Sequence, residues 1–222
     1  MTFLSRLVLR QASVVAALGR LLNPDHDGRR MDAQHRLIWS AFAGGAAARR
    51  DFLWREMGQR QFLVLSAQPP KPSPLFEEPE VTGFAPALAA GDRLAFLLRA
   101  DATRTVTVAD GKKRHRDVVM EALHGLPAGD RAETRMDLAQ EAGAAWLTGQ
   151  GARAGFTMLR ADVTAYRVVE PPGQGQRRPR FGVLDLEGVI EVTDPALFLP
   201  KLVQGVGRAK AFGCGLMLIC RA

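Results

Sequence analysis

The sequence has little cysteine and no long hydrophobic run. Its two cysteines, Cys214 and Cys220, have no histidine near them in sequence, so the chain shows neither a zinc-site pattern nor a disulfide framework. Low cysteine use is typical of the reducing cytoplasm, where we expect this protein to be located. No stretch approaches the roughly 20 apolar residues of a membrane helix, and the start, MTFLSRLVLRQ, lacks signal-peptide features. We therefore expect neither secretion nor a membrane partner.

Two phosphate-binding motifs are also missing. Residues 205–219, GVGRAKAFGCGLMLI, are glycine-rich, but their spacing fits neither the Walker loop nor the G-x-G-x-x-G dinucleotide fingerprint. The loop also precedes an apolar run, Leu216 to Cys220, whereas both motifs follow a strand. Glycines this dense predict positive φ angles or close backbone approach to another group. The loop glycines are Gly205, Gly207, Gly213 and Gly215.

Aromatic motifs for reading single-stranded RNA are absent as well. No stretch matches the motif by which RRM domains stack bases on a sheet. Trp39, Trp54 and Trp146 lie in apolar segments and are expected in the core. If the partner is RNA, duplex recognition is therefore favoured over base stacking across a sheet.

The chain is rich in apolar and basic side chains. Of 222 residues, 47% are hydrophobic, enough for a buried core, and the formal net charge is +7. Arginine carries most of this charge, and its guanidinium matches phosphate, so nucleic acid is the first expected partner. One basic run is as typical of a solvated surface as of a binding site, but several runs in a basic chain favour phosphate contacts. The basic segments contain Arg29 and Arg30; Lys112, Lys113, Arg114 and Arg116; Arg177, Arg178 and Arg180; and Arg208 with Lys210.

Hydrophobic periodicity divides the chain into two similar halves. Each half reads as a strand, a helix, two strands, a connection or second helix, and a final strand, which predicts an α+β protein of two tandem ferredoxin-like (RRM-like) domains. Each domain is expected to have an antiparallel sheet with helices on one face, over residues 1–100 and 101–222. In the first half the second helix would fall in a proline-interrupted stretch. The expected strands are 3–9, 51–57, 61–68, 92–100, 103–108, 155–170, 180–194 and 216–220, and the expected helices are 31–42, 133–148 and 195–204.

Several segments together resemble one family over nearly the full length. They are the glycine loop with Arg208 and Lys210 inside it, FLSRLVL, QHRLIWSAF, RRDFLWRE, FLVLSAQPP and LEGVIEVTDP. The chain resembles the CasE-type CRISPR repeat-processing endoribonucleases of the Cascade complex, in the RAMP superfamily. The resemblance implies two ferredoxin-like folds, recognition of the CRISPR repeat RNA hairpin, other Cascade subunits as partners, and cleavage without a metal or cofactor. It also implies a cyclic 2′,3′-phosphate product that stays bound.

The resemblance assigns the catalytic role to His35. RNA supplies its own nucleophile, the 2′-hydroxyl, and a histidine exchanges protons near neutral pH. From the residues alone a structural histidine, in the core or on the surface, is favoured over a catalytic one, since His35 shares a helix face with Ile38 and Phe42. The match is incomplete, because Asp32 stands where some members have a tyrosine and Tyr166 is the only tyrosine.

The other histidines and cations complete the prediction. His26 lies in a turn-forming stretch, PDHDG, and His115 lies inside a basic segment. Arg36, next to the catalytic histidine, joins the basic segments as an expected RNA contact, and in the resembled family the connection containing Arg177 is a basic hairpin. The glycine loop is expected to lie close to the helix of His35 or to RNA. The alternative function is a non-catalytic RNA-binding subunit of a CRISPR ribonucleoprotein; a nucleotide-binding regulator is disfavoured by the missing motifs.

Overall fold

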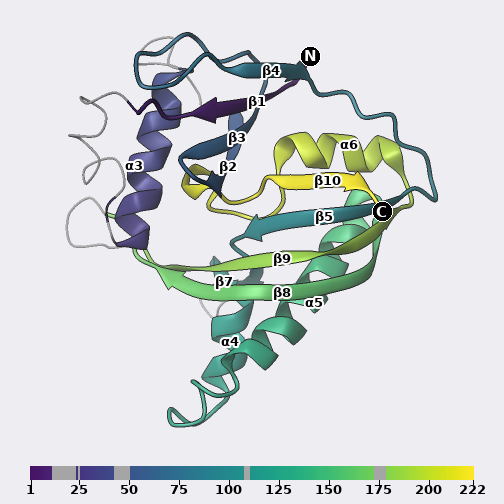
Figure 1. Cartoon of the computed structure of the whole chain (residues 1–222). Coiled ribbons are helices and arrows are strands. Elements are labelled where there is room, and N and C mark those ends of the chain that lie inside the picture. The colour runs from purple at the N-terminus through teal and green to yellow at the C-terminus, as the bar shows by residue number, and fades with distance from the viewer. Residues whose placement is uncertain (12–23, 25, 43–50, 108–110, 173–178) are drawn as a thin grey trace.

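The first sheet has four antiparallel strands in the order β2-β3-β1-β4 (Figure 1). This computed structural model describes residues 1–11, 24, 26–42, 51–107, 111–172 and 179–222. Helix α3 follows β1 in the chain and precedes the β2–β3 hairpin. The elements are β1 (Phe3–Val8), α3 (Asp27–Ser40), β2 (Phe52–Gly58), β3 (Gln61–Ser66) and β4 (Glu80–Gly83).

The second sheet has the order β10-β5-β9-β8 and is also antiparallel. In both sheets the first and third strands of the unit are central and the second and fourth are at the edges, so the prediction of two ferredoxin-like folds is confirmed. The elements are β5 (Arg93–Ala100), α5 (Arg135–Ala154), β8 (Phe156–Val169), β9 (Phe181–Val192), α6 (Pro195–Gln204) and β10 (Met217–Arg221).

An insertion separates the first strand of the second unit from its first helix. It consists of the hairpin β6 (Thr103–Thr107) and β7 (Lys113–Asp117), followed by the short helix α4 (Val118–His124). Asp117 caps α4, because its carboxylate accepts hydrogen bonds from the amides of Val119 and Met120. The sequence predicted neither α4 nor β4, since both are too short to show a period.

The strand at residues 93–100 belongs to the second sheet, which corrects its expected place in the first unit. It pairs with β9 on one side and β10 on the other. The alternation of β5 identifies a strand but carries no information about its neighbours. The change from one sheet to the other therefore comes between β4 and β5, before residue 93 instead of at residue 100.

Within its described residues, the first unit lacks the second helix that the ferredoxin-like pattern predicts on one face of its sheet. Only α3 covers its sheet among the residues that the structure describes, and residues 67–79 form no helix. Prolines at 69, 70, 72, 74 and 79 explain this, because proline removes a backbone donor and restricts the preceding residue. In this described part of the chain no helix is long and apolar enough to cross a membrane.

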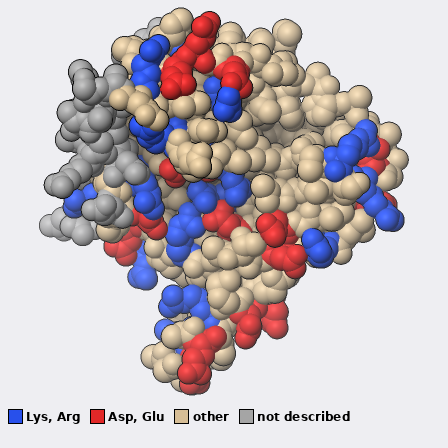
Figure 2. Space-filling view, viewed as in Figure 1, with Lys and Arg blue, Asp and Glu red and all other residues tan. Residues whose placement is uncertain are grey.

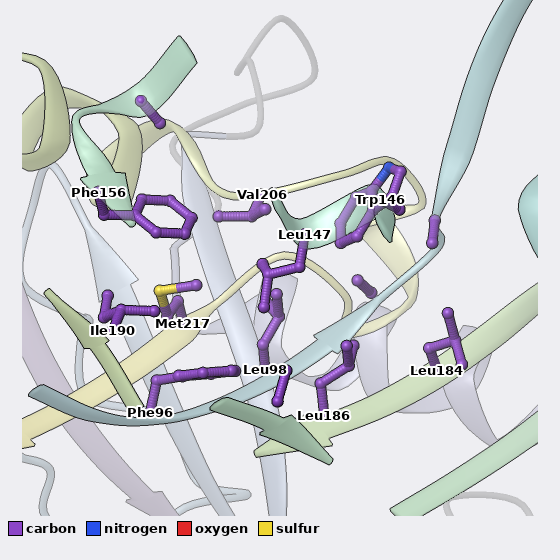
Figure 3. Close-up of a cluster of buried hydrophobic side chains, with 14 of the residues drawn as sticks. Phe96, Leu98, Trp146, Leu147, Phe156, Leu184, Leu186, Ile190, Val206 and Met217 are labelled. Carbon is purple, nitrogen blue, oxygen red and sulfur yellow. The ribbon is translucent and has the colours of Figure 1, made fainter. Parts of the chain in front are cut away.

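Apolar clusters hold the two sheets and α3 together, and three of them show how the sheets are covered. In the largest, side chains from β5, β9, α5 and β10 point toward one another (Figure 3). The second lies between α3 and the first sheet and contains Ile38, Phe52 and Trp54. The third joins the opposite face of that sheet, at Leu53 and Leu65, to Leu216 before β10. The last cluster places the glycine-rich loop at the junction of the two sheets.

Candidate functional site

His35 lies in the second half of α3, at the edge of an aromatic group. Its ring centroid is 6.0 Å from that of Trp39 and 5.9 Å from that of Phe52. The residue is half-buried, and its Nδ1 is shielded from solvent. An imidazole that is held by packing and still reaches the surface suits proton exchange with a bound ligand. The structure thus places His35 between the two positions that the sequence left open, the core and the surface.

Two local features fix the start of α3 against the second sheet. His26 caps the helix, and its Nδ1 accepts a hydrogen bond of 3.2 Å from the Gly28 amide. A Cβ on Gly28 would lie 2.3 Å from the carbonyl oxygen of Glu170, just beyond β8. Only glycine permits this approach, so α3 contacts both sheets: it covers the first and rests its first turn on the end of the second. His26 therefore acts as a helix cap in this structure.

The glycine-rich loop has the backbone that its sequence predicted. Its four glycines have φ angles between 75° and 95°, the left-handed region. All four also lie close to other groups: for example, a Cβ on Gly207 would lie 2.9 Å from the carbonyl oxygen of Asp101, and one on Gly213 would lie 3.1 Å from the Trp54 ring. The loop therefore packs between β2 of the first sheet and the end of β5 in the second.

The loop packs on the helix that carries His35, as predicted. Met31, one turn before His35, lies in one buried cluster with Cys214, and Phe212 packs against this cluster. Phe212 closes the short helix η1 (Lys210–Phe212). The two cations of the loop differ in setting: Arg208 is exposed, whereas the half-buried Lys210 donates a hydrogen bond of 2.6 Å to the Gln204 carbonyl. Arg208 is thus the more accessible cation.

Two of the three predicted cations of α3 form ion pairs with carboxylates on the same helix. Arg30 pairs with Asp27, and Arg36 pairs with Asp32 at 2.8 Å. Arg29 is exposed. Asp32, the residue that departs from the family pattern, therefore has an ion-pair partner one turn away. Exposed pairs of this kind are weak, so Arg36 can exchange its partner for a phosphate at little cost.

Most of the second basic segment forms a strand, β7. Lys113, Arg114, His115 and Arg116 all lie in β7 and are exposed, and Lys112 precedes them. The β6–β7 hairpin thus presents cations on both of its faces. Of the third segment, Arg180 is exposed and lies 3.5 Å from Glu170, while Arg177 and Arg178 lie outside the described residues.

Basic side chains from three segments meet at one pocket. Arg116 of β7, Arg180 before β9 and Arg208 of the glycine loop line a cavity of about 630 Å³ together with Asp101 and Asp117. Arg29, Arg36 and Lys210 do not line it. On the face seen in Figure 2, basic side chains gather over α3 and the adjoining ends of β8 and β9, with acidic ones among them. This mixed surface favours contacts at defined positions over uniform electrostatic attraction.

A buried ionic group that the sequence analysis missed lies where the two sheets meet. Asp185 of β9 accepts hydrogen bonds from Arg99 at 2.8 Å and from Arg167 at 2.9 Å, and Arg55 of the first sheet approaches it to 3.5 Å. Burial acts to raise the pKa of Asp185, but the hydrogen bonds and charges of Arg99 and Arg167 lower it below its usual value. Charged residues within otherwise apolar strands were the available signal for this group.

A smaller cavity, of about 340 Å³, lies between this group and α3. Arg30 and Gln34 of α3 line it with Glu56, Arg99 and Arg167. Its cations already face carboxylates, so it is a polar junction between the units. Among all the described residues, no three His, Cys, Asp or Glu side chains lie close enough together to hold a metal ion.

Known structures share this fold over the full chain. A structure of CRISPR endoribonuclease Cse3 bound to a 19-nucleotide RNA has 25% sequence identity and a TM-score of 0.66, with 99% of this chain and 98% of that one covered. The CRISPR-associated protein Cas6e from Escherichia coli K-12 has 19% identity and a TM-score of 0.62, with 99% and 100% covered. A chain of a CRISPR RNA-guided surveillance complex before nicking has 17% identity, the same coverage and a TM-score of 0.61.

Sequence comparison agrees with the structural one. No curated protein matches the chain. A family model described as CRISPR associated protein matches residues 2–221, nearly the whole sequence. With the tandem ferredoxin-like folds and the glycine loop packed on α3, this match shows that the chain belongs to the CRISPR associated protein family.

Proposed function

We propose that this chain is an endoribonuclease that binds the hairpin of CRISPR repeat RNA and cleaves the precursor RNA. Family membership and the fold shared with RNA-bound Cse3 support this function. The observation that carries the proposal is the packing of the glycine loop on α3 through Met31 and Phe212. It brings the segment with Arg208 and Lys210 alongside the helix with His35.

His35 supplies the proton transfer in this mechanism. The 2′-hydroxyl of the RNA attacks the adjacent phosphorus, the bond to the 5′-oxygen breaks, and a cyclic 2′,3′-phosphate forms. His35 accepts the 2′-hydroxyl proton or donates one to the leaving 5′-oxygen, and Arg208 or Lys210 neutralises the charge that develops on the phosphate. The nucleophile belongs to the substrate, so no metal ion is required to activate water.

Binding is distributed over the cations of α3, the β6–β7 hairpin, Arg180 and the glycine loop. A-form RNA is recognised through its shape and its phosphates, which suits separate exposed cations better than one deep site. Cleavage near the base of the stem leaves the recognised hairpin on one fragment, so the product stays bound. With excess hairpin RNA, we expect one rapid turnover per protein followed by a much slower phase.

The mechanism is tested by cleavage assays in which the chemical group at the 3′ end of the upstream RNA fragment is identified. The protein is incubated with a labelled repeat hairpin, with and without EDTA, and with a hairpin carrying a 2′-deoxy residue at the cleaved position. We expect cleavage that survives EDTA, a cyclic phosphate, and a deoxy hairpin that binds intact. EDTA-sensitive cleavage would contradict the mechanism, whereas binding without any cleavage would establish the alternative, a non-catalytic RNA-binding subunit.

Assembly with other subunits follows from the same family. The surveillance-complex chain has this fold. A protein that keeps its RNA product bound can join other subunits that bind the same RNA. We therefore propose other Cascade subunits as partners. Co-purification from cells with and without a CRISPR array tests this: partners that are retained only with the array would show that the RNA joins them.

A further inference from the structure

The pocket lined by Arg116, Arg180 and Arg208 has features beyond phosphate binding. It is bounded by the β6–β7 hairpin, α4 and the glycine loop, and its lining combines cations, carboxylates and aromatic rings. Phe181 and Phe212 line it with ring centroids 5.4 Å apart. A groove that tracks only phosphates needs neither a carboxylate nor an aromatic wall.

Asp101 is the least expected member of this lining. It is 5% exposed, and its Oδ1 has no hydrogen-bond partner among the described residues. Burial and the charge of Asp117 raise the pKa of Asp101 to about 6, while the charge of Arg208 opposes this. Near neutral pH the folded protein thus carries a buried carboxylate that is poorly compensated, which costs stability. A ligand that donates hydrogen bonds would offset this cost.

Asp117, the neighbouring carboxylate, is engaged through one of its two oxygens, Oδ1. It accepts hydrogen bonds from the amides of Val119 and Met120 and from the Tyr166 hydroxyl at 3.2 Å. Asp117 therefore holds α4 in place through its Oδ1, whereas its Oδ2 and the Oδ1 of Asp101 are both buried without a hydrogen-bond partner among the described residues.

One cation of the pocket, Arg208, is held next to Asp101 by the backbone. The amide of Arg208 donates a hydrogen bond of 3.2 Å to the Asp101 carbonyl, so the two residues are adjacent across a β-bridge. The Arg208 side chain is exposed, and it lines the pocket together with Asp101. Arg180, directly before β9, supplies a second exposed cation.

We propose that this pocket binds a single unstacked guanine nucleotide. Guanine presents two adjacent donors, N1–H and the 2-amino group, and a carboxylate accepts both; adenine and uracil present one donor beside an acceptor. Asp101 accepts from the base edge, Phe181 and Phe212 contact the base, and Arg208 and Arg180 bind its phosphate. The nucleotide is either free or an unpaired guanosine of the RNA, and the second case rests on the proposed function.

The RNA source is tested by guanosine-to-inosine replacement, which deletes only the 2-amino donor. Each guanosine of an uncleavable 2′-deoxy repeat hairpin with its flanks is replaced in turn, and affinity is measured. We expect one position to lose about 10-fold with the wild-type protein. The loss should disappear in Asp101→Asn, an isosteric variant, and persist in Asp162→Asn, which removes an exposed carboxylate of β8 outside the pocket.

The free-nucleotide source is tested by equilibrium dialysis with GMP and IMP. Stronger binding of GMP, lost in Asp101→Asn and weakened in Arg208→Ala, would show a site for free nucleotides. A position-specific inosine effect without GMP binding would assign the site to the RNA. An inosine effect that is unchanged in Asp101→Asn, or the absence of any guanine preference in both experiments, would overturn the proposal. Because the hairpin is uncleavable, these results are independent of whether the protein cuts RNA.

Discussion

Trp54 of β2 donates a hydrogen bond from its indole Nε1 to the carbonyl oxygen of Ala211, 3.3 Å away. The same ring lies under Gly213, where a Cβ would be 3.1 Å from it. One side chain of the first sheet thus holds the glycine loop in position, and through Met31 the loop contacts α3. The relative placement of His35 and Arg208 depends on this contact.

Gly213→Ala is expected to destabilise the protein and displace the loop. The residue has a φ of 75°, and the added methyl group meets the buried Trp54 ring. Backbone strain and contact together should cost about 1–3 kcal/mol in urea denaturation. The matched control is Gly83→Ala in β4, where the methyl group meets open space, and its cost should be within about 0.5 kcal/mol. Equal costs for the two variants would contradict this role of the ring.

His35→Ala is expected to abolish cleavage while hairpin affinity stays within a few-fold of the wild type. A general acid or base supplies about 10²- to 10⁴-fold in rate, whereas the binding energy is spread over many cations. Single-turnover cleavage and filter binding measure the two effects. Ser40→Ala, an exposed position on the same helix, is the control and should retain its rate. Intact cleavage by His35→Ala would remove this histidine from the mechanism.

Hairpin affinity should fall steeply with salt, because several cations displace counterions from the RNA. Arg208→Ala should lower the slope of log K against log salt by about 1, since it removes one phosphate contact. Arg160→Ala removes an exposed cation of β8 that pairs with Asp162 outside the pocket, and should leave the slope unchanged. Equal slopes for the wild type and Arg208→Ala would show that Arg208 does not contact a phosphate.

Asp101→Asn is expected to change the pH dependence of stability. Burial, and then Asp117, raise the pKa of Asp101 from 3.8 to about 6 in the folded protein. The folded state therefore binds this proton more tightly, so the contribution to stability is full below pH 4 and is lost as pH rises through 6. Relative to the variant, the wild type should lose roughly 2 kcal/mol between pH 4 and pH 7. Parallel profiles of unfolding free energy against pH would refute this assignment.

Much of the local structure was predictable from periodicity. The β2–β3 hairpin, the long β8–β9 pair and helix α6 lie where alternation and helical spacing placed them. The sheet that receives β5 was not predictable, because an alternating strand fits either sheet equally well and only packing selects its neighbours. The missing second helix of the first unit follows from its prolines.

The candidate site shows the same division. Glycine spacing predicted the backbone of residues 205–215, since only glycine adopts those φ angles without strain. The family resemblance, and not the pattern of residues, singled out His35. The sequence did not predict that Arg116, Arg180 and Arg208 line one pocket or that Asp101 is buried beside them, because these residues lie far apart in the chain.

By itself, the sequence determined the elements, the basic character and the glycine loop, because these depend on local backbone preference and on composition. Tertiary structure alone decided that β5 joins the second sheet, that Asp185 gathers arginines from both units, and that Asp101 lies buried beside Arg208. These relationships join residues far apart in the chain, and they arise from packing two sheets and a helix around one loop, which no local pattern encodes.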